Sequence, residues 1–415
     1  MTLKDDFKPR SHTSDRDLVI VGGGIVGATL AAALRNSGLN ITIIEAQPLA
    51  VAAARKQAYA FSLLSSRIYQ NIGVWDKILP QVGKFSQISL SDADYQQKVS
   101  FETNDLNTEH LGYVAPHNVV LTALQDYLAQ CANVSWLCPA EVTNVIKNTN
   151  FSTVEVSVDG KTQLINTKLV IGADGARSRI RSLAGIKTRG WKYWQSCVAF
   201  TIEHTAPENH TAFERFWFTG PMGVLPLLGN RCQIVWTHPH AGAKALQQLD
   251  ESEFLAKLQH YLGGVLGDIK LVSDRVLFPV QLMQCDRYIR PRLALVGDAA
   301  HCCHPVGGQG LNLGIRDAAS LAEILSLAVE RGEDLGSIKV LKRYERWRKP
   351  ENLAILGFTD FLDRMFSNNW LPVVTIRRLG LRMMNQISPI KIFALKLMTG
   401  LKGKTPQLAQ LNLEN

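Results

Sequence analysis

The stretch LALVGDAAHCCHPVGGQGLNLGIR, residues 293–316, decides the fold. Its first four residues, Leu293–Val296, form an apolar run that is typical of one buried strand. The run ends at a carboxylate, Asp298, and a glycine-rich loop follows. After the loop, apolar residues recur at the spacing of one helix face, namely Leu311, Ile315, Ala318, Ala319, Ala322 and Leu325. The stretch therefore predicts a strand, a glycine-rich turn and a helix.

The chemistry of this turn narrows the class of ligand. Glycines let the backbone approach a ligand closely, and a helix start presents free N–H groups and the positive end of a dipole. Asp298 would repel a phosphate but suits a chain of hydroxyl groups, whereas the loop suits a planar group that becomes negative. A flavin ring on a ribityl chain meets both demands. The alternative interpretation is an ordinary strand–turn–helix with flexible glycines.

The whole run closely resembles the flavin-binding signature of the ubiquinone-biosynthesis FAD-dependent aromatic hydroxylases, the octaprenyl-methoxyphenol hydroxylase group. This group belongs to the larger class typified by para-hydroxybenzoate hydroxylase. The resemblance implies that Asp298 holds the ribityl chain and that the loop from Gly307 to Asn312 faces the pyrimidine edge of the flavin. The residues that it places at the ring are Pro305, Gly307, Gly308, Gly310, Leu311 and Asn312. The first three would position the flavin, and no acid or base is assigned.

A second motif lies near the start of the chain. The apolar strand Leu18–Val21 leads into GGGIVG, an alanine-rich helix over 28–36 follows, and the strand Ile41–Ile44 ends at Glu45. This is the dinucleotide-binding βαβ fingerprint in its required context. Glu45 should accept hydrogen bonds from the ribose hydroxyls of the adenosine, although the fingerprint does not separate NAD from FAD. The glycines of the fingerprint are Gly22, Gly24 and Gly27.

A third motif follows a hairpin that Asp159-Gly160 predicts. The strand Lys168–Ile171 ends close to Asp174 and Gly175, just before an Arg/Ser helix start. A simple turn would explain so short a stretch. Asp174 and Gly175 nevertheless resemble the Asp-Gly motif that helps FAD and NAD(P)H to bind in this flavoprotein class. One departure from the family is Gln57, which stands where an arginine usually falls and puts one cofactor contact in doubt.

The resemblance spans roughly residues 17–385 and implies an α/β fold with a Rossmann-type FAD-binding domain. We expect a disordered arm over residues 1–16 and three pieces of FAD-binding domain over residues 17–79, 104–190 and 276–350. Alternating aromatic-rich strands, such as AFERFWF and CQIVWT, predict an interleaved β-rich substrate domain over residues 80–103 and 191–275. A C-terminal helical basic segment takes residues 351–415.

The composition is ordinary for a soluble globular protein of 415 residues, with 46% hydrophobic and 20% charged residues. No run of 18 uncharged apolar residues occurs, and the polar start lacks the apolar core of a signal peptide, so we expect a cytoplasmic protein. The seven cysteines show no paired framework, which indicates a reducing compartment. Cys302 and Cys303 lie between two histidines, but four adjacent side chains cannot easily converge on one ion, so we expect no metal.

The net charge of +9 is concentrated near the C-terminus. From Arg364 to Leu413 there are eight basic residues and no acidic one, with many apolar residues between them. This pattern favours helices that lie on the inner, cytoplasmic face of an anionic membrane. The helices should be short, because Pro372 and Pro389 interrupt the segment. A helical cap whose basic face is merely solvated explains the pattern nearly as well. The basic residues are Arg364, Arg377, Arg378, Arg382, Lys391, Lys396, Lys402 and Lys404.

The resemblance implies a monooxygenase that hydroxylates a phenolic ring, expected to be a prenylated quinone precursor. FAD would be its cofactor, NAD(P)H its co-substrate and O2 its oxidant, through a flavin C(4a)-hydroperoxide. We expect no nucleic-acid partner. Other flavoenzyme chemistry, such as epoxidation or halogenation, stays open, although Trp191 and Trp194 do not have the spacing of a tryptophan-halogenase motif. A non-catalytic FAD-binding subunit of a quinone-biosynthesis complex also stays open.

Overall fold

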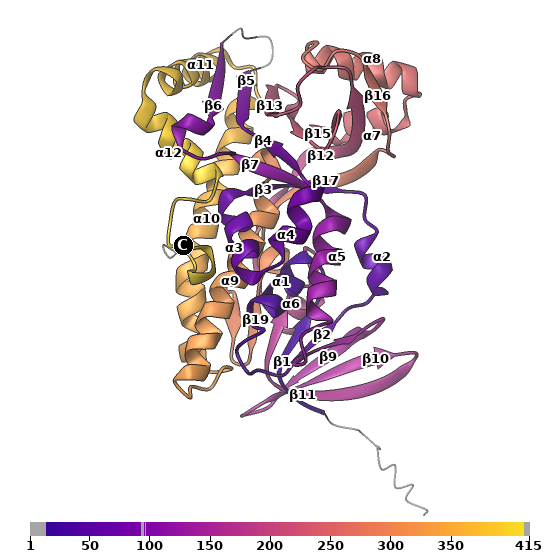
Figure 1. Cartoon of the computed structure of the whole chain (residues 1–415), viewed down its shortest axis with the longest axis vertical. Helices are drawn as coiled ribbons and strands as arrows, with labels where there is room; N and C mark the ends of the chain where they lie inside the picture. Colours follow the sequence, from indigo (N-terminus) through magenta and orange to yellow (C-terminus); the bar gives the residue numbers. More distant parts are fainter. Residues whose placement is uncertain (1–13, 93–94, 96, 411–415) are drawn as a thin grey trace, which may run out of the picture.

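A mainly parallel sheet flanked by helices forms the lower half of the molecule in Figure 1, and a larger sheet forms the upper half. The computed structural model describes residues 14–92, 95 and 97–410. The lower sheet runs in the order β18-β19-β11-β1-β2-β8, and β9 and β10 extend it from β11. Its strands are β1 (Ser14–Val21), β2 (Ile41–Ile44), β8 (Val134–Leu137), β9 (Glu141–Lys147), β10 (Ser152–Val158), β11 (Lys161–Gly172), β18 (Ile289–Arg290) and β19 (Leu293–Leu295).

The centre of the lower sheet is a Rossmann-type unit. Strand β1 pairs in parallel with β2 on one side and with β11 on the other, and β19 continues the parallel array beyond β11. Helix α1 (Ile25–Ala33) connects β1 to β2 and packs against α5 (His117–Leu128) and α9 (Gln309–Glu330). Because α1 is covered on these sides, nearly all of its residues are apolar or small and buried.

The upper sheet, here called the β-rich sheet, runs in the order β20-β17-β12-β15-β14-β13-β5-β6, and β16 also pairs with β12. Helices α7 (His240–Gln248) and α8 (Glu251–Leu262) cover one face of it, where Phe254 packs edge-on against Phe200 at a ring distance of 4.9 Å. The strands are β5 (Gln87–Asp92), β6 (Lys98–Glu102), β12 (Thr188–His204), β13 (Thr211–Trp217), β14 (Gly220–Pro226), β15 (Arg231–Pro239), β16 (Ile269–Leu271), β17 (Val276–Cys285) and β20 (His301–Cys302).

A small three-stranded sheet joins the two halves. It consists of β3 (Ala58–Ser62), β7 (Gly112–Pro116) and β4 (Gly83–Phe85), and β3 lies beside the glycine-rich loop before α9. Short helices complete the lower half, namely α2 (Leu49–Ala53), α3 (Leu63–Ile72), α4 (Trp75–Ile78) and α6 (Arg179–Leu183).

Three helices follow α9. The first, α10 (Ile338–Phe366), runs along the left side of Figure 1 and reaches the β-rich sheet, where α11 (Leu371–Gln386) and α12 (Ser388–Met398) fold against β5 and β6. Pro372 and Pro389 each lie in the first turn of their helix, where the missing N–H costs nothing. Among the described residues, no helix is both long and apolar enough to cross a bilayer.

The predicted fold class is confirmed, but four details differ. Residues 14–16 of the expected arm belong to β1 and pair with residues 165–167, whereas residues 1–13 lie outside the described part. Residues 276–285, expected in the FAD-binding domain, form β17 and pair with β12. The expected boundary at residue 351 falls inside α10, and the region predicted to be β-rich also contains two helices that were not predicted, α7 and α8.

Candidate active site

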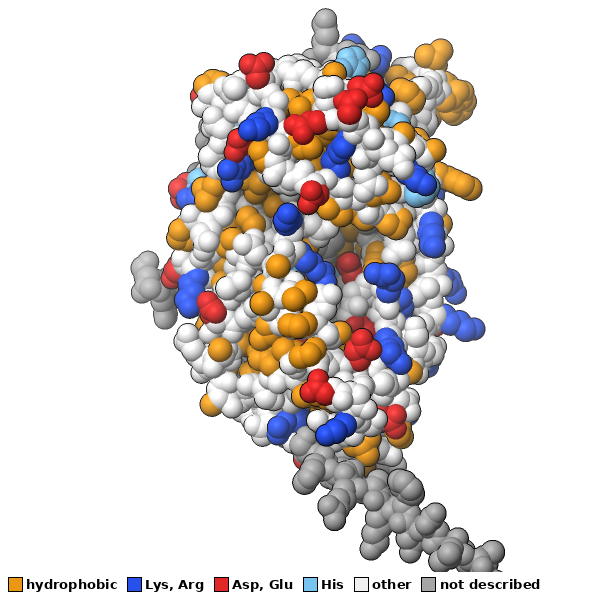
Figure 2. Space-filling view, turned by 90° about the vertical axis from the view of Figure 1, so that its right-hand side faces the viewer, with side chains coloured by type: hydrophobic (Ala, Val, Ile, Leu, Met, Phe, Trp, Pro, Cys, Tyr) orange, Lys and Arg blue, Asp and Glu red, His pale blue; other side chains and the backbone are white. Residues whose placement is uncertain are grey.

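A cavity of about 880 Å³ runs from the βαβ unit, past the glycine-rich loop, to the β-rich sheet. Figure 2 shows the face that carries α2 and α5 hollowed near its middle, with charged side chains around the hollow. Most of the residues predicted to contact a cofactor line this cavity, namely Gly22, Gly24, Glu45, Asp174, Gly175, Asp298, Pro305, Gly307, Gly308, Gly310 and Leu311. Gly27 and Asn312 do not line it.

Each of the three fingerprint glycines is required for a different physical reason. Gly22 has a φ of +104° and packs so closely that a Cβ would lie 2.4 Å from the carbonyl oxygen of Ala173. A Cβ on Gly27 would lie 2.0 Å from the carbonyl oxygen of Gly22, so Gly27 permits close packing of helix on strand. A Cβ on Gly24 would meet no protein atom within 4 Å, and Gly24 caps the N-terminus of α1 at the cavity. The open space there suits a phosphate group.

Two carboxylates flank this end of the cavity, and the structure engages them differently. Glu45 accepts hydrogen bonds from the amides of Gly23 at 2.8 Å and Gln47 at 3.0 Å, which leaves lone pairs for ribose hydroxyls. Asp174 is more fully occupied, because it accepts from the Ser178 hydroxyl at 2.5 Å and from two amides at the start of α6. Asp174 therefore holds the turn in place, and its predicted contact with a cofactor stays a prediction.

Three guanidinium groups also line the cavity, and the sequence motifs did not single them out as ligands. They belong to Arg55, Arg177 and Arg179, and all three residues are exposed. Guanidinium groups pair well with phosphates. Nearby, Gln57 accepts a hydrogen bond from the Tyr59 hydroxyl at 3.1 Å, and burial raises the pKa of Tyr59 to about 12.

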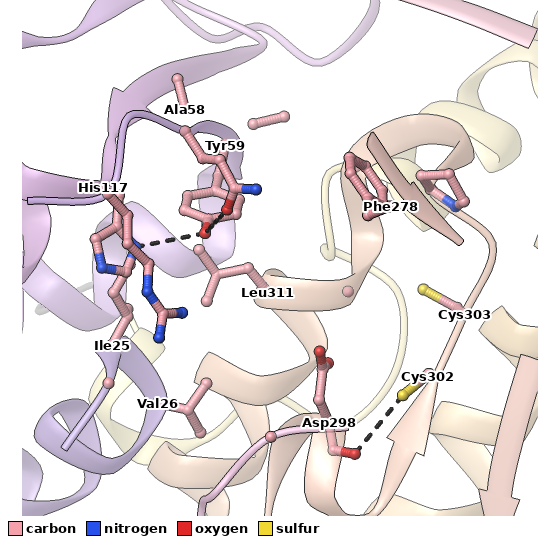
Figure 3. Close-up of a pocket in the computed structure, with 18 of the residues that line it drawn as sticks. Ile25, Val26, Ala58, Tyr59, His117, Phe278, Asp298, Cys302, Cys303 and Leu311 are labelled. Atoms are coloured by element: carbon pink, nitrogen blue, oxygen red, sulfur yellow. Dashed lines mark hydrogen bonds between the residues drawn. The ribbon is translucent and has the colours of Figure 1, made fainter. Parts of the chain in front are cut away.

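Asp298 projects into the cavity from the turn after β19 (Figure 3). Within the described chain, its carboxylate accepts no hydrogen bond, so both oxygens are open to hydroxyl groups. The surrounding protein raises the pKa of Asp298 by desolvation. The turn itself is fixed from behind by Asp317, which accepts from the amide of Gly297 at 3.1 Å and contacts His301 at 2.6 Å.

Asp317 belongs to a buried network of charged groups beneath that turn. Arg348 donates to it at 2.8 Å and Asn352 at 2.9 Å, and the side chains of both ions are fully buried. Burial alone would raise the pKa of Asp317, but His301 and Arg348 outweigh it and hold the pKa well below its usual range. The network therefore keeps the turn and Asp298 in one position, a role that only the structure reveals.

The glycine-rich loop opens α9 with two consecutive left-handed residues, Gly307 at φ +66° and Gly308 at φ +61°. A Cβ on Gly308 would lie 2.9 Å from the Cβ of Ala60, so a side chain at this position would collide with β3. Gly310 and Leu311 follow in the first turn of α9 and line the cavity. The free N–H groups of that turn can receive negative charge on a ring.

Asn312 fastens the loop instead of facing the cavity. Its side-chain oxygen accepts from the amide of Ser62 at 2.9 Å and the hydroxyl of Ser65 at 2.7 Å. Its amide nitrogen donates to the carbonyls of Ala60 at 2.8 Å and Gly308 at 2.9 Å. Because all four bonds stay inside the protein, the side chain acts on a cofactor only through the loop.

The four side chains from His301 to His304 point to different partners. His301 faces Asp317, whereas His304 lies 3.2 Å from Gln195 and accepts a hydrogen bond from the amide of Val306 at 3.3 Å. Burial lowers the pKa of His304 to about 4, so it is neutral and shapes the loop. The sulfurs of Cys302 and Cys303 lie at the cavity wall (Figure 3). No three metal-ligating side chains converge in the part of the chain that the structure describes.

The far end of the cavity reaches β13, where Glu214 accepts a hydrogen bond from the amide of Gly307 at 3.2 Å. Glu214, Val306 and Gly307 also line a second cavity of about 380 Å³ between the β-rich sheet and helices α10, α11 and α12. Most of the other residues around this second cavity are apolar, including Phe216 and Leu362. We call it the apolar cavity. The two cavities therefore meet at Glu214.

Three comparisons with known proteins agree with this geometry. A family model described as FAD binding domain matches residues 15–359. The chain belongs to the ubiquinone-biosynthesis FAD-dependent hydroxylase family. It is 36% identical to ubiquinone hydroxylase UbiL of Rhodospirillum rubrum, over 92% of this chain and 90% of that protein. It is also 56% identical to the uncharacterized protein slr1300 of Synechocystis, over 95% of each chain.

The fold of the hydroxylase is also found in a crystal structure of p-nitrophenol 4-monooxygenase PnpA from Pseudomonas putida. The two structures share a TM-score of 0.79 at 19% identity, over 94% of this chain and 100% of the other. The hydroxylase is an FAD-dependent enzyme that oxygenates an aromatic ring. The alternatives of halogenation, epoxidation and a non-catalytic subunit are not favoured, and Trp191 and Trp194 line neither cavity.

The residues of the hydroxylase fit FAD. The open space at Gly24 and the nearby guanidinium groups suit the pyrophosphate, Glu45 suits the adenosine ribose, and Asp298 suits the ribityl hydroxyls. The first turn of α9 would lie along the ring. FAD, when bound, supplies the redox and oxygen chemistry of the reaction. The chain supplies orientation, exclusion of water and a fixed set of N–H dipoles.

Proposed function

We propose that the hydroxylase acts on a prenylated phenol, a quinone precursor, with NAD(P)H as the electron donor and O2 as the oxidant. The single observation that carries this proposal is the junction between the two cavities. A phenolic ring placed there meets the flavin loop at Gly307, and an apolar chain attached to that ring has the apolar cavity beside it. The relative UbiL is named as a ubiquinone hydroxylase, which supports a substrate of this chemical class.

The walls of the apolar cavity support the proposal of a prenyl chain on the substrate. They come from α10, α11, α12 and the β-rich sheet, and they include Phe358, Leu362, Met365, Met384, Ala394 and Leu397. Transfer of an apolar chain from water stabilises the complex by about 0.8 kcal/mol per buried CH2 group. Methionine side chains are unbranched and flexible, so Met365 and Met384 can adapt to the shape of a flexible chain. The cavity therefore favours an isoprenoid over a free small phenol.

The test uses the FAD-loaded protein and phenols that carry prenyl chains of increasing length. We expect NAD(P)H-dependent oxygen consumption and a hydroxylated product, with kcat/KM rising with chain length until the apolar cavity is full. Ala394→Phe should reduce kcat/KM for the long-chain phenols and spare the short ones. Ala241→Phe, on the exposed side of α7, is the matched control and should change neither. Equal kcat/KM for all chain lengths would contradict the proposal.

We further propose that α11 and α12 dock the hydroxylase on an anionic membrane surface, where such a substrate resides. Large apolar side chains are exposed on α11 and just before it, including Trp370 at 68%, Leu371 at 77% and Leu379 at 55%. Ile376 and Met383 are exposed on the same helix and also line the apolar cavity, so the cavity opens toward this surface. A lipid substrate could then enter the cavity without crossing water.

In the structure, fewer basic side chains are available to bind an anionic membrane than the sequence indicated. Of the eight basic residues in the tail, several are engaged within the protein, because Asp92 pairs with Arg377 and Arg378, and Lys391 pairs with Asp105 at 2.8 Å. The ammonium groups of Lys396, Lys402 and Lys404 form no ion pair among the described residues, and all three residues are exposed. Apolar insertion should therefore supply more of the binding energy than charge does.

A truncation after residue 365 would not test docking cleanly, because it would also open the apolar cavity. We propose the triple variant Trp370→Ser, Leu371→Ser, Leu379→Ser, measured by co-sedimentation with phosphatidylcholine–phosphatidylglycerol vesicles. Binding should fall at least tenfold, and in the native protein it should weaken only modestly as salt is raised.

The matched control removes three apolar residues elsewhere that are each more than half exposed, with Val51→Ser, Phe218→Ser, Leu228→Ser. This control should bind the vesicles as the native protein does. Vesicle binding that is absent in the native protein, or that is lost equally in both triple variants, would leave α11 and α12 as a structural cap.

A further inference from the structure

We propose that Glu214 is a catalytic residue of the hydroxylase, the base that takes the proton from the phenolic hydroxyl of the substrate. This inference rests on the proposed function, because it requires a phenol at the junction of the two cavities. No sequence motif indicated Glu214, which is one of the polar residues that alternate with apolar ones in the predicted strand AFERFWF.

The position of Glu214 is what carries the inference. It is the one acidic residue, among those the structure describes, that lines both the larger cavity along the glycine-rich loop and the apolar cavity. Its Oε2 accepts from the amide of Gly307, a residue of the flavin loop, at 3.2 Å. That bond fixes one carboxylate oxygen and leaves the other without a hydrogen-bond partner among the described residues. A phenol whose ring faces the loop would bring its hydroxyl to that second oxygen.

The surroundings keep this carboxylate poised for proton transfer. Glu214 lies opposite Gly223 on β14 and Leu90 on β5, neither of which carries a charge. The described residues give it no ion pair, and burial raises its pKa to about 7, with the Gly307 amide opposing the rise. A base with a pKa near the working pH is the most effective one.

The other titratable groups nearby are either uncharged or paired with other residues. Cys197 on β12 has a pKa that burial raises to about 12, so it stays a neutral thiol. Arg377 on α11 lines the apolar cavity but is paired with Asp92. His304 is neutral and bonded to Gln195, beside Asp363 on α10. None of these groups competes with Glu214 for the substrate proton.

The proposed step is a simple proton transfer. The phenolic O–H bond breaks, the proton bonds to the free carboxylate oxygen of Glu214, and the electron pair stays on the phenolate oxygen. The phenolate ring is more electron-rich and accepts an electrophilic oxygen more readily. After the ring is hydroxylated with electrons from NAD(P)H and oxygen from O2, the proton returns to the product oxygen, and Glu214 is again ionised.

Glu214→Gln is the informative variant, because its amide oxygen can still accept the bond from Gly307 while it cannot take a proton. Glu203→Gln, at an exposed ion pair on the same sheet, is the matched control. We expect E214Q to hold FAD and to oxidise NAD(P)H, but to release most of the oxygen as hydrogen peroxide. Hydroxylated product per NAD(P)H should fall at least tenfold, whereas E203Q should behave as the native enzyme does.

Two further measurements separate proton transfer from mere packing. In the native enzyme, product formation should rise with pH through an apparent pKa near 7, and this rise should be absent in E214Q. Binding of a prenylated phenol and of its methyl ether, followed by flavin fluorescence without turnover, should favour the phenol about tenfold in the native protein. That preference should disappear in E214Q.

Unchanged coupling and an unchanged pH profile in E214Q would overturn the role of Glu214. A native enzyme that oxidises no NAD(P)H with any prenylated phenol would instead contradict the proposed function. If E214Q alone lost FAD, Glu214 would be a structural support of the loop, which would also overturn the proposal.

Discussion

Arg377 and Asp92 form a buried bidentate ion pair that joins α11 to the end of β5, with N–O distances of 2.8 and 3.0 Å. The same guanidinium group donates to the carbonyls of Met365 and Phe366 at the end of α10 and to that of Asn368 in the turn before α11. The pair thus fixes the wall of the apolar cavity to the β-rich sheet.

Arg377→Met should lower the free energy of unfolding by about 3–5 kcal/mol, because it leaves Asp92 buried with only the half-exposed Arg378 beside it. Urea unfolding measures this. Arg231→Met, which breaks an exposed pair with Glu203, should cost about 0–1 kcal/mol. If the two variants lost equal stability, the buried pair would have no special structural role.

Asp298→Ala should reduce FAD affinity roughly tenfold or more, since hydrogen bonds to a charged group contribute about 1.5–3 kcal/mol. Flavin retained after gel filtration, together with titration of the flavin-free protein, measures the loss. Asp126→Ala, on the exposed side of α5, should leave the affinity unchanged. Circular dichroism should be the same for both variants, and a fully loaded D298A would mean that the ribityl chain lies elsewhere.

Gly310→Val tests the flavin loop better than a change at Gly308. Position 308 needs a positive φ and a Cβ there would strike Ala60, so a valine would disturb folding and binding together. A Cβ at Gly310 lies in a regular helix turn, 3.8 Å from the sulfur of Cys303, and points to the cavity wall.

We expect Gly310→Val to abolish NAD(P)H-dependent oxygen consumption while the far-ultraviolet circular dichroism stays native. Gly357→Val in α10, where a Cβ meets open space, is the control for the helix propensity of valine and should keep full turnover. Turnover that survives in G310V would place the flavin away from this loop.

Glu214→Gln should stabilise the protein at pH 8. A raised pKa means that the folded state holds the proton of Glu214 more tightly than the unfolded chain does. The stability due to this group is therefore full below pH 4.5, falls as the pH rises towards about 7, and stays lost above it. Because that shift corresponds to at most about 3 kcal/mol, thermal unfolding of E214Q and native protein should coincide near pH 5 and diverge by pH 8.

The local motifs of this chain were predictable because their signals are short-range. The hairpin at Asp159-Gly160 has the positive φ angles, +49° and +76°, that a type I′ turn requires. Helix α8 also carried a local signal, since Asp250 caps its first turn through the amide of Glu253, but the aromatic strands around it hid that pattern. The sequence analysis therefore predicted a β-rich region there and did not predict the two helices within it.

The rest of the site depends on contacts between distant residues. Glu214 follows the alternation of an ordinary strand, and only the crossing of β13 with the loop at Gly307 sets it between two cavities. The available charge of the C-terminal basic segment could not be predicted from the sequence for the same reason. Asp92 lies 285 positions before Arg377, and the count of basic residues did not indicate that the two would form a buried ion pair. Pairings of this length leave no periodic trace in a sequence.

Because of the short strand β20, the two halves of the molecule cannot be exchanged independently by protein engineering. It lies between Asp298 and the glycine-rich loop, yet it pairs with β17 as the edge of the β-rich sheet. A chimaera that exchanged only residues 191–275 for those of a relative would leave β17 and β20 behind and set a foreign sheet on a native edge. Transplanting substrate preference between hydroxylases of this fold thus requires moving residues 276–302 as well, and with them the anchor of the ribityl chain.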